Sequence, residues 1–79
     1  MKLKLTVHAQ KRIKERGVDV EHIKKAIAKP DLKEKHGDGK FKATKKIRKR
    51  KIVVVYCMDG FRFKNKQGDE YIIVTAYYL

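Results

Sequence analysis

Three polar residues near the start of the chain have types and spacing suited to proton transfer and to binding an anion. His8, Arg12 and Arg16 are each four residues apart, so on a helix they form one cationic stripe that drifts slowly around the axis. Ala9 and Ile13 form a neighbouring apolar row, and we therefore expect the stripe to border the packed face of that helix. The alternative is that His8 is exposed to solvent and that the arginines solvate the helix or pair with carboxylates.

The charge balance of the whole chain predicts a polyanionic partner. In 79 residues, 22 Lys and Arg stand against 9 Asp and Glu, a formal net charge of +13. A polyanion relieves the resulting self-repulsion, and nucleic acid is the first candidate. A membrane surface is a weaker one, because membrane-binding basic helices usually carry Trp or Phe, and this chain has no Trp. Thermal adaptation does not explain the excess, since that enrichment is balanced in sign.

The densest run of charge lies between Lys40 and Lys51, where eight of the twelve residues are basic. Apolar residues are interspersed in this run, which favours a hairpin with a basic tip over a disordered tail. Cationic density alone attracts phosphates, because binding releases counterions. The alternative is a solvated loop. The residues that we predict to bind RNA here are Lys42, Lys45, Lys46, Arg48, Lys49, Arg50 and Lys51.

Two short helices are predicted in the first part of the chain. The first covers residues 6–16, with Thr6 as its N-cap and Gly17 at its end. Asp19 can cap the second, which Pro30 stops. The two helices would form a hairpin.

The second helix has one apolar face. Val20, Ile23 and Ile27 recur at helical spacing, and we expect all three to pack. His22 lies on the opposite side, where the sequence predicts solvent exposure and no role.

After Pro30 the pattern changes to that of strands. Residues 52–58 and 71–78 are β-branched and aromatic and apolar on both faces, as in central strands. Residues 32–36 and 40–47 are weaker candidates, and residues 59–69 fit either a hairpin turn or a longer loop. The prediction is a single α+β domain over residues 1–79. In it the helical hairpin packs on one face of an antiparallel sheet of three to five strands.

The last strand should present different residues on its two faces. Regular alternation places Ile72, Val74, Ala76 and Tyr78 on one face and Tyr71, Ile73, Thr75 and Tyr77 on the other. The second set has the more functional character, because tyrosines can stack on unpaired bases, and we include Tyr77 among the RNA-binding residues. The alternative is that each tyrosine packs in the core with its hydroxyl at the rim.

The sequence gives no indication of a metal, a cofactor or a membrane. The single cysteine, Cys57, lies in an apolar run and is expected to be a core thiol. No metal-ligand spacing, phosphate-binding glycine loop or nucleophile elbow is present. No stretch has the length of a signal peptide core or a transmembrane span, so a cytoplasmic location is expected.

The segment HAQKRIKERGV, residues 8–18, carries a family resemblance. It resembles the pattern H-A-x-x-R-x-x-x-R-G-[IV] of a widespread family of small proteins, in which a helix ending near a Pro-Asp pair follows. A final strand like residues 72–77 completes that pattern, so the resemblance spans nearly the whole chain. This family is grouped with the ribonuclease-toxin fold of RelE-type toxins, barnase-like nucleases and tRNA-cleaving colicins.

The resemblance implies a metal-independent endoribonuclease, a hydrolase of the toxin–antitoxin type. Its substrate would be RNA, on or off the ribosome, and an acidic antitoxin protein would inhibit it. By the same resemblance His8 would act as base or acid, Arg12 and Arg16 would clamp phosphate, and Thr75 would orient the scissile phosphate. The alternative is a non-catalytic RNA- or ribosome-binding module, which explains the charge equally well. A DNA-binding accessory protein is a weaker reading, because no recognition-helix motif is apparent.

Overall fold

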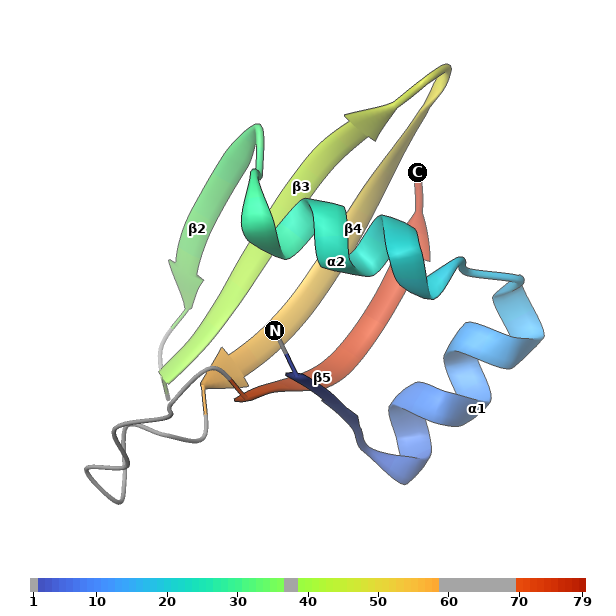
Figure 1. The fold of residues 1–79 in the computed structure, drawn as a ribbon, viewed down its shortest axis with the longest axis vertical. Coiled ribbons are helices and arrows are strands. Elements are labelled where there is room, and N and C mark those ends of the chain that lie inside the picture. The colour runs from blue at the N-terminus through green and yellow to red at the C-terminus, as the bar shows by residue number, and fades with distance from the viewer. Residues whose placement is uncertain (1, 37–38, 59–69) are drawn as a thin grey trace.

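The computed structural model describes residues 2–36, 39–58 and 70–79, which form five strands and two helices (Figure 1). In chain order these elements are β1 (Lys2–Leu5), α1 (Val7–Arg16), α2 (Val20–Ala28), β2 (Leu32–His36), β3 (Lys40–Ile47), β4 (Arg50–Met58) and β5 (Glu70–Tyr78). The ambiguous segment 59–69 lies outside the described residues.

The ends of the two helices are fixed by the capping residues that the sequence predicts. The Thr6 hydroxyl accepts a hydrogen bond from the Ala9 N–H at 3.0 Å, and the Asp19 carboxylate accepts one from the Glu21 N–H at 2.9 Å. Gly17 ends α1 in the left-handed conformation, with φ of 61°, which glycine adopts without steric strain. The three predicted caps are confirmed.

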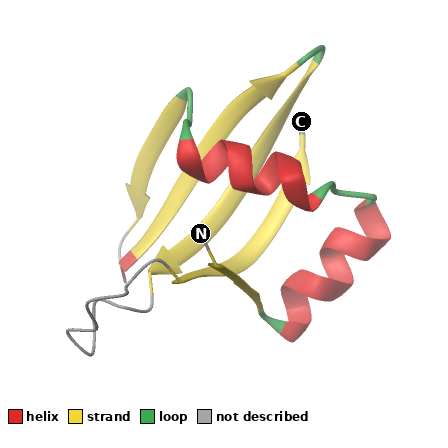
Figure 2. Ribbon diagram, in the orientation of Figure 1, coloured by secondary structure: helices red, strands yellow, loops and turns green. Residues whose placement is uncertain are grey.

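The five strands form one sheet in the order β1-β5-β4-β3-β2, which confirms the predicted α+β class (Figure 2). β1 pairs with β5 in parallel, and the other three pairs are antiparallel. β1 was not expected from the sequence. This strand has only four residues, and its partner lies at the other end of the chain.

Both helices cover the same face of the sheet. α2 packs on β3 and β4, and α1 packs on β5 and β1. Their apolar residues meet those of the sheet in one core. Its buried members are Ala9, Ile13, Val18, Ile23, Ala26, Ile27, Ala43, Ile52, Val54, Tyr56, Ile73 and Ala76. Val20 does not join them and is 38% exposed, so the predicted three-residue apolar face of α2 is wrong at its first position.

A β-bulge in β5 changes which residues share a face. Val55 pairs with Thr75 but Tyr56 pairs with Ile73, so Val74 is the extra residue between them. Beyond the bulge the alternation is reversed, and the regular alternation predicted for this strand is therefore wrong. Tyr71 and Ile73 lie on the helix-covered face with Ala76 and Tyr78, whereas Thr75 and Tyr77 lie on the other face.

Tyr56 lies at the centre of an aromatic group in the core. Its ring stacks on Phe41 at a centroid distance of 5.7 Å and meets Tyr71 edge-on at 5.6 Å. Burial raises the pKa of Tyr56 above its ordinary value of 10.0, and neighbouring Tyr71 raises this pKa further. The folded state therefore binds this proton more tightly than the unfolded state does.

We expect Tyr56→Phe to reduce the loss of stability at alkaline pH. The contribution of the neutral phenol is complete below pH 10 and is lost as the pH rises through the raised pKa. The measurement is the free energy of unfolding in denaturant between about pH 8 and pH 11. Tyr77→Phe, a tyrosine outside the core, is the control and should follow the wild type. If the free energy of unfolding fell equally steeply with pH in the two variants, the prediction would be contradicted.

Candidate nucleic-acid interface

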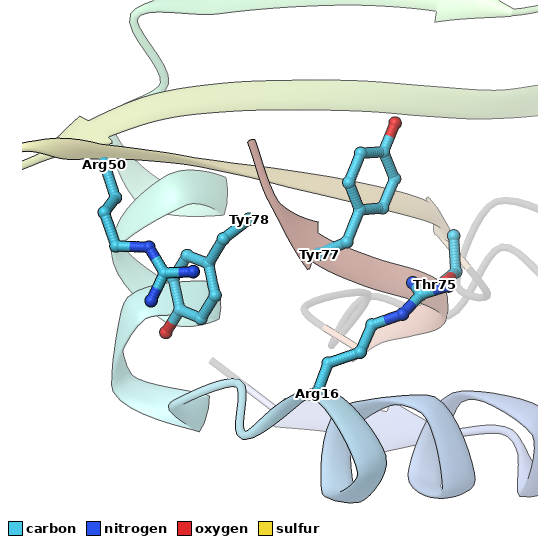
Figure 3. A pocket seen from close by; sticks show the side chains of 5 residues that line it. All are labelled: Arg16, Arg50, Thr75, Tyr77 and Tyr78. Atoms are coloured by element: carbon cyan, nitrogen blue, oxygen red, sulfur yellow. The ribbon is translucent and has the colours of Figure 1, made fainter.

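A cavity of about 640 Å³ lies at the end of β5 (Figure 3). Its lining comes from three elements: the last residue of α1, the first residue of β4 and the last part of β5. The lining residues are Arg16, Arg50, Thr75, Tyr77 and Tyr78. Successive residues of a strand point to opposite faces, so Tyr77 and Tyr78 approach the cavity from the two sides of the sheet.

Arg16 reaches from the end of α1 to the edge of β5. β1 pairs only with Glu70 to Ile73, so it does not cover the following part of that edge. There an Arg16 Nη donates a hydrogen bond to the Ala76 carbonyl oxygen at 3.4 Å, and the guanidinium carbon lies 5.7 Å from the centroid of the Tyr77 ring. The remaining N–H groups of Arg16 are available to a ligand.

Arg50 approaches the cavity from the other side. Its guanidinium carbon lies 4.3 Å from the centroid of the Tyr78 ring, a cation–π contact that holds the side chain in place (Figure 3). Among the described residues no carboxylate forms an ion pair with Arg50 or with Arg16. Two guanidinium groups therefore line one cavity, and no described carboxylate neutralises either of them.

The hydroxyl of Tyr78 joins a polar group at the start of α2. It accepts a hydrogen bond from the Asp19 N–H at 3.1 Å and lies 2.8 Å from Nδ1 of His22. Nε2 of His22 is 3.9 Å from the Asp19 carboxylate. The His22 side chain is only 29% exposed, so the predicted solvent exposure of this residue is wrong. The first turn of α2 lies against the end of β5, and this contact covers the imidazole.

The face of the sheet away from the helices, here called the open face, carries cations beside polar and aromatic groups. Strand register places side chains in rows across it. Lys42, Val55 and Thr75 form one row, Thr44, Val53 and Tyr77 form the next, and Lys46 and Lys51 form a third. Val53 is 1% exposed, although neither α1 nor α2 covers this face.

Other residues of the basic run do not lie on the open face. The Lys45 ammonium donates to the Lys29 carbonyl oxygen at 2.9 Å and lies 4.0 Å from the Asp31 carboxylate, which ties β3 to the segment after α2. Arg48 and Lys49 form the turn between β3 and β4. The basic run is therefore divided between the two faces of the sheet and the turn that joins β3 to β4, because successive side chains of a strand point to opposite faces.

The predicted catalytic residues are only partly brought together. Arg16 and Thr75 line the same cavity, with the predicted RNA-binding residues Arg50 and Tyr77. His8 is exposed in the first turn of α1 and Arg12 is half-buried, and neither lines the cavity. Their proposed roles stay predictions.

Cys57 is half-buried rather than part of the core cluster. It pairs with Lys40 and Ile72, two rows from Val53 on the open face, so the expected core thiol is not found.

Residues 5–78 match the model of a family described as a domain of unknown function, DUF4258. The chain belongs to the DUF4258 family. No curated protein and no solved structure matches the chain. The DUF4258 description assigns no activity, so the resemblance to ribonuclease toxins stays a prediction.

Two further findings concern the described part of this DUF4258 chain. Neither helix there has the length and apolarity needed to cross a membrane. Within the same residues, no three His, Cys, Asp or Glu side chains lie close enough together to hold a metal ion.

Proposed function

We propose that this DUF4258 domain binds RNA in the cytoplasm and cleaves it as a metal-independent endoribonuclease of the toxin type. The observation that carries the proposal is that Arg16 and Arg50 line one cavity, to which the described residues contribute no carboxylate. Guanidinium groups bind phosphate oxygens through parallel hydrogen bonds, and two of them can neutralise one phosphodiester. The Thr75 hydroxyl adds a further hydrogen-bonding group to the same cavity.

The open face supports RNA as the source of that phosphate. Thr75 and Tyr77 line the cavity and also belong to rows of the open face: the row of Thr75 leads to Lys42, and the row of Tyr77 lies beside the one that holds Lys46 and Lys51. A strand held in the cavity can continue along these rows, with its phosphates near the lysines and an unpaired base on the Tyr77 ring. An acidic antitoxin would compete for the same cations.

The cavity offers part of what RNA cleavage requires. Attack of a 2′-hydroxyl on the neighbouring phosphorus needs a proton acceptor, cations for the charged phosphorane and a proton donor for the leaving oxygen. Arg16 and Arg50 supply the cations. The resemblance assigns the proton transfer to His8.

A second candidate function is a non-catalytic RNA- or ribosome-binding module. It is favoured by the position of His8, which is exposed and outside the lining of the cavity. The cations of the cavity and of the open face would serve binding alone in this case.

The test is binding and cleavage of a labelled single-stranded RNA in the presence of EDTA. If about five phosphate contacts form, the logarithm of the association constant should fall with the logarithm of salt concentration at a slope of about −3 to −4. Cleavage should persist in EDTA and leave 2′,3′-cyclic phosphate ends. Binding without cleavage would favour the module, and failure to bind at low salt would overturn both functions.

A further inference from the structure

We infer that Tyr78 and His22 are the proton-transfer pair of the cavity, with Tyr78 accepting the proton of the attacking 2′-hydroxyl. This inference rests on the proposed endoribonuclease activity and assigns its base to residues other than His8. It starts from the 2.8 Å contact between Nδ1 of His22 and the hydroxyl of Tyr78, a residue that lines the cavity.

Tyr78 differs chemically from the other residues that line the cavity. The guanidinium groups of Arg16 and Arg50 do not release a proton in proteins and cannot accept one. Thr75 and Tyr77 have hydroxyls, but the structure gives neither of them a hydrogen bond to a described titratable side chain. Tyr78 is therefore the member of the lining that joins the cavity to a histidine.

The hydrogen bonds around Tyr78 fix the direction of proton transfer. The Asp19 N–H donates to the Tyr78 oxygen, so this oxygen directs its own proton to Nδ1 of His22. Nδ1 is then the acceptor, and Nε2 carries the ring proton toward the Asp19 carboxylate, 3.9 Å away. One lone pair of the phenol oxygen is left for a substrate hydroxyl.

Charges on both sides of the pair favour the transfer. When His22 takes the proton it becomes an imidazolium beside the Asp19 carboxylate. The Arg50 guanidinium covers the Tyr78 ring, with its carbon 4.3 Å from the ring centroid, and it therefore stabilises negative charge that develops on the phenol oxygen. Arg50 therefore has two roles, binding phosphate and stabilising the charge of Tyr78.

The complete step balances without a further reactant. The O–H bond of the 2′-hydroxyl breaks and its proton passes to the Tyr78 oxygen, while the Tyr78 proton passes to His22. The 2′-oxygen forms a bond to phosphorus, and the bond from phosphorus to the 5′-oxygen breaks with its electron pair on that oxygen. This oxygen takes a proton from water, and His22 later returns its proton to solvent. The products are a 2′,3′-cyclic phosphate and a 5′-hydroxyl.

The competing explanation is that the same contacts only attach α2 to β5. Tyr78→Phe distinguishes the two, because it removes the hydroxyl and keeps the ring beneath Arg50. We expect the cleavage rate of this variant to fall by about 10²-fold or more, with RNA affinity within about twofold of the wild type. Tyr71→Phe is the matched control, because it removes a hydroxyl from the same strand at a residue that packs against the core outside the cavity, and its cleavage rate should stay within about twofold of the wild type.

His22→Ala provides a readout that an attachment role would not affect. Its cleavage rate should fall by a similar factor, and free imidazole should restore part of it by occupying the vacated space. His36→Ala, on the exposed strand β2, should cleave like the wild type without imidazole. Melting temperatures of all variants show whether each protein is folded in the assay.

Cleavage by Tyr78→Phe at the wild-type rate would overturn the inference and leave the endoribonuclease function intact. Loss of activity in His22→Ala that imidazole does not restore would also overturn it. A wild-type protein that binds RNA without cleaving it would instead remove the proposed activity, and the inference with it.

Discussion

Cleavage of RNA by the double variant Arg16→Gln, Arg50→Gln is expected to be at least about 10³-fold slower than cleavage by the wild type. Removing one preorganised donor to a developing negative charge typically slows an enzyme by about 10² to 10³-fold. Both arginines line the cavity without a carboxylate partner among the described residues. They would therefore act on the charged phosphorane together.

The effect on binding should be smaller than the effect on cleavage. The double variant loses two contacts to phosphate, which lowers affinity by about 10 to 100-fold at low salt. Single-turnover cleavage at saturating protein separates the two effects. The control is Lys11→Gln, Lys14→Gln, which removes the same charge from exposed positions of α1 and should cleave at nearly the wild-type rate. Equal rates for the two double variants would contradict a role of the cavity in cleavage.

The helices and the central strands were predictable because local signals determine them. Thr6, Gly17 and Asp19 have side-chain or backbone preferences that act within one turn of the helix, and the structure uses each of them as a cap. Residues 52–58 and 71–78 are long apolar β-branched runs, and they became the central strands β4 and β5.

The features that the sequence did not predict depend on contacts between distant residues. β1 is a strand because it pairs with Glu70 to Ile73. The bulge at Val74 depends on the register between β4 and β5, and it decides that Tyr71 and Tyr77 lie on opposite faces. A period-two pattern contains no information about where one extra residue is inserted.

The candidate site was only partly predictable for the same reason. The spacing of the stripe on α1 placed Arg16 at the border of the packed face, from which it reaches β5. The density of the basic run indicated an RNA-binding segment, but pairing in the sheet divided that run between two faces. His22 was missed because its partner, Tyr78, is 56 residues away in the sequence.

Two triple variants of equal charge test whether RNA binding depends on where the positive charge lies rather than on its total. One variant changes Lys42, Lys46 and Lys51 on the open face to Gln, and the other changes Lys11, Lys14 and Lys25 on the helices to Gln. The measurement is the affinity of each for a single-stranded RNA as a function of salt.

The open-face variant should bind about 10² to 10³-fold more weakly than the wild type at about 50 mM salt, because three phosphate contacts are lost. The slope of log affinity against log salt should decrease in magnitude by about 2. The helix variant should stay within about fivefold of the wild type, since its lysines act only through the long-range field. Equal losses of affinity in the two variants would contradict binding of RNA on the open face.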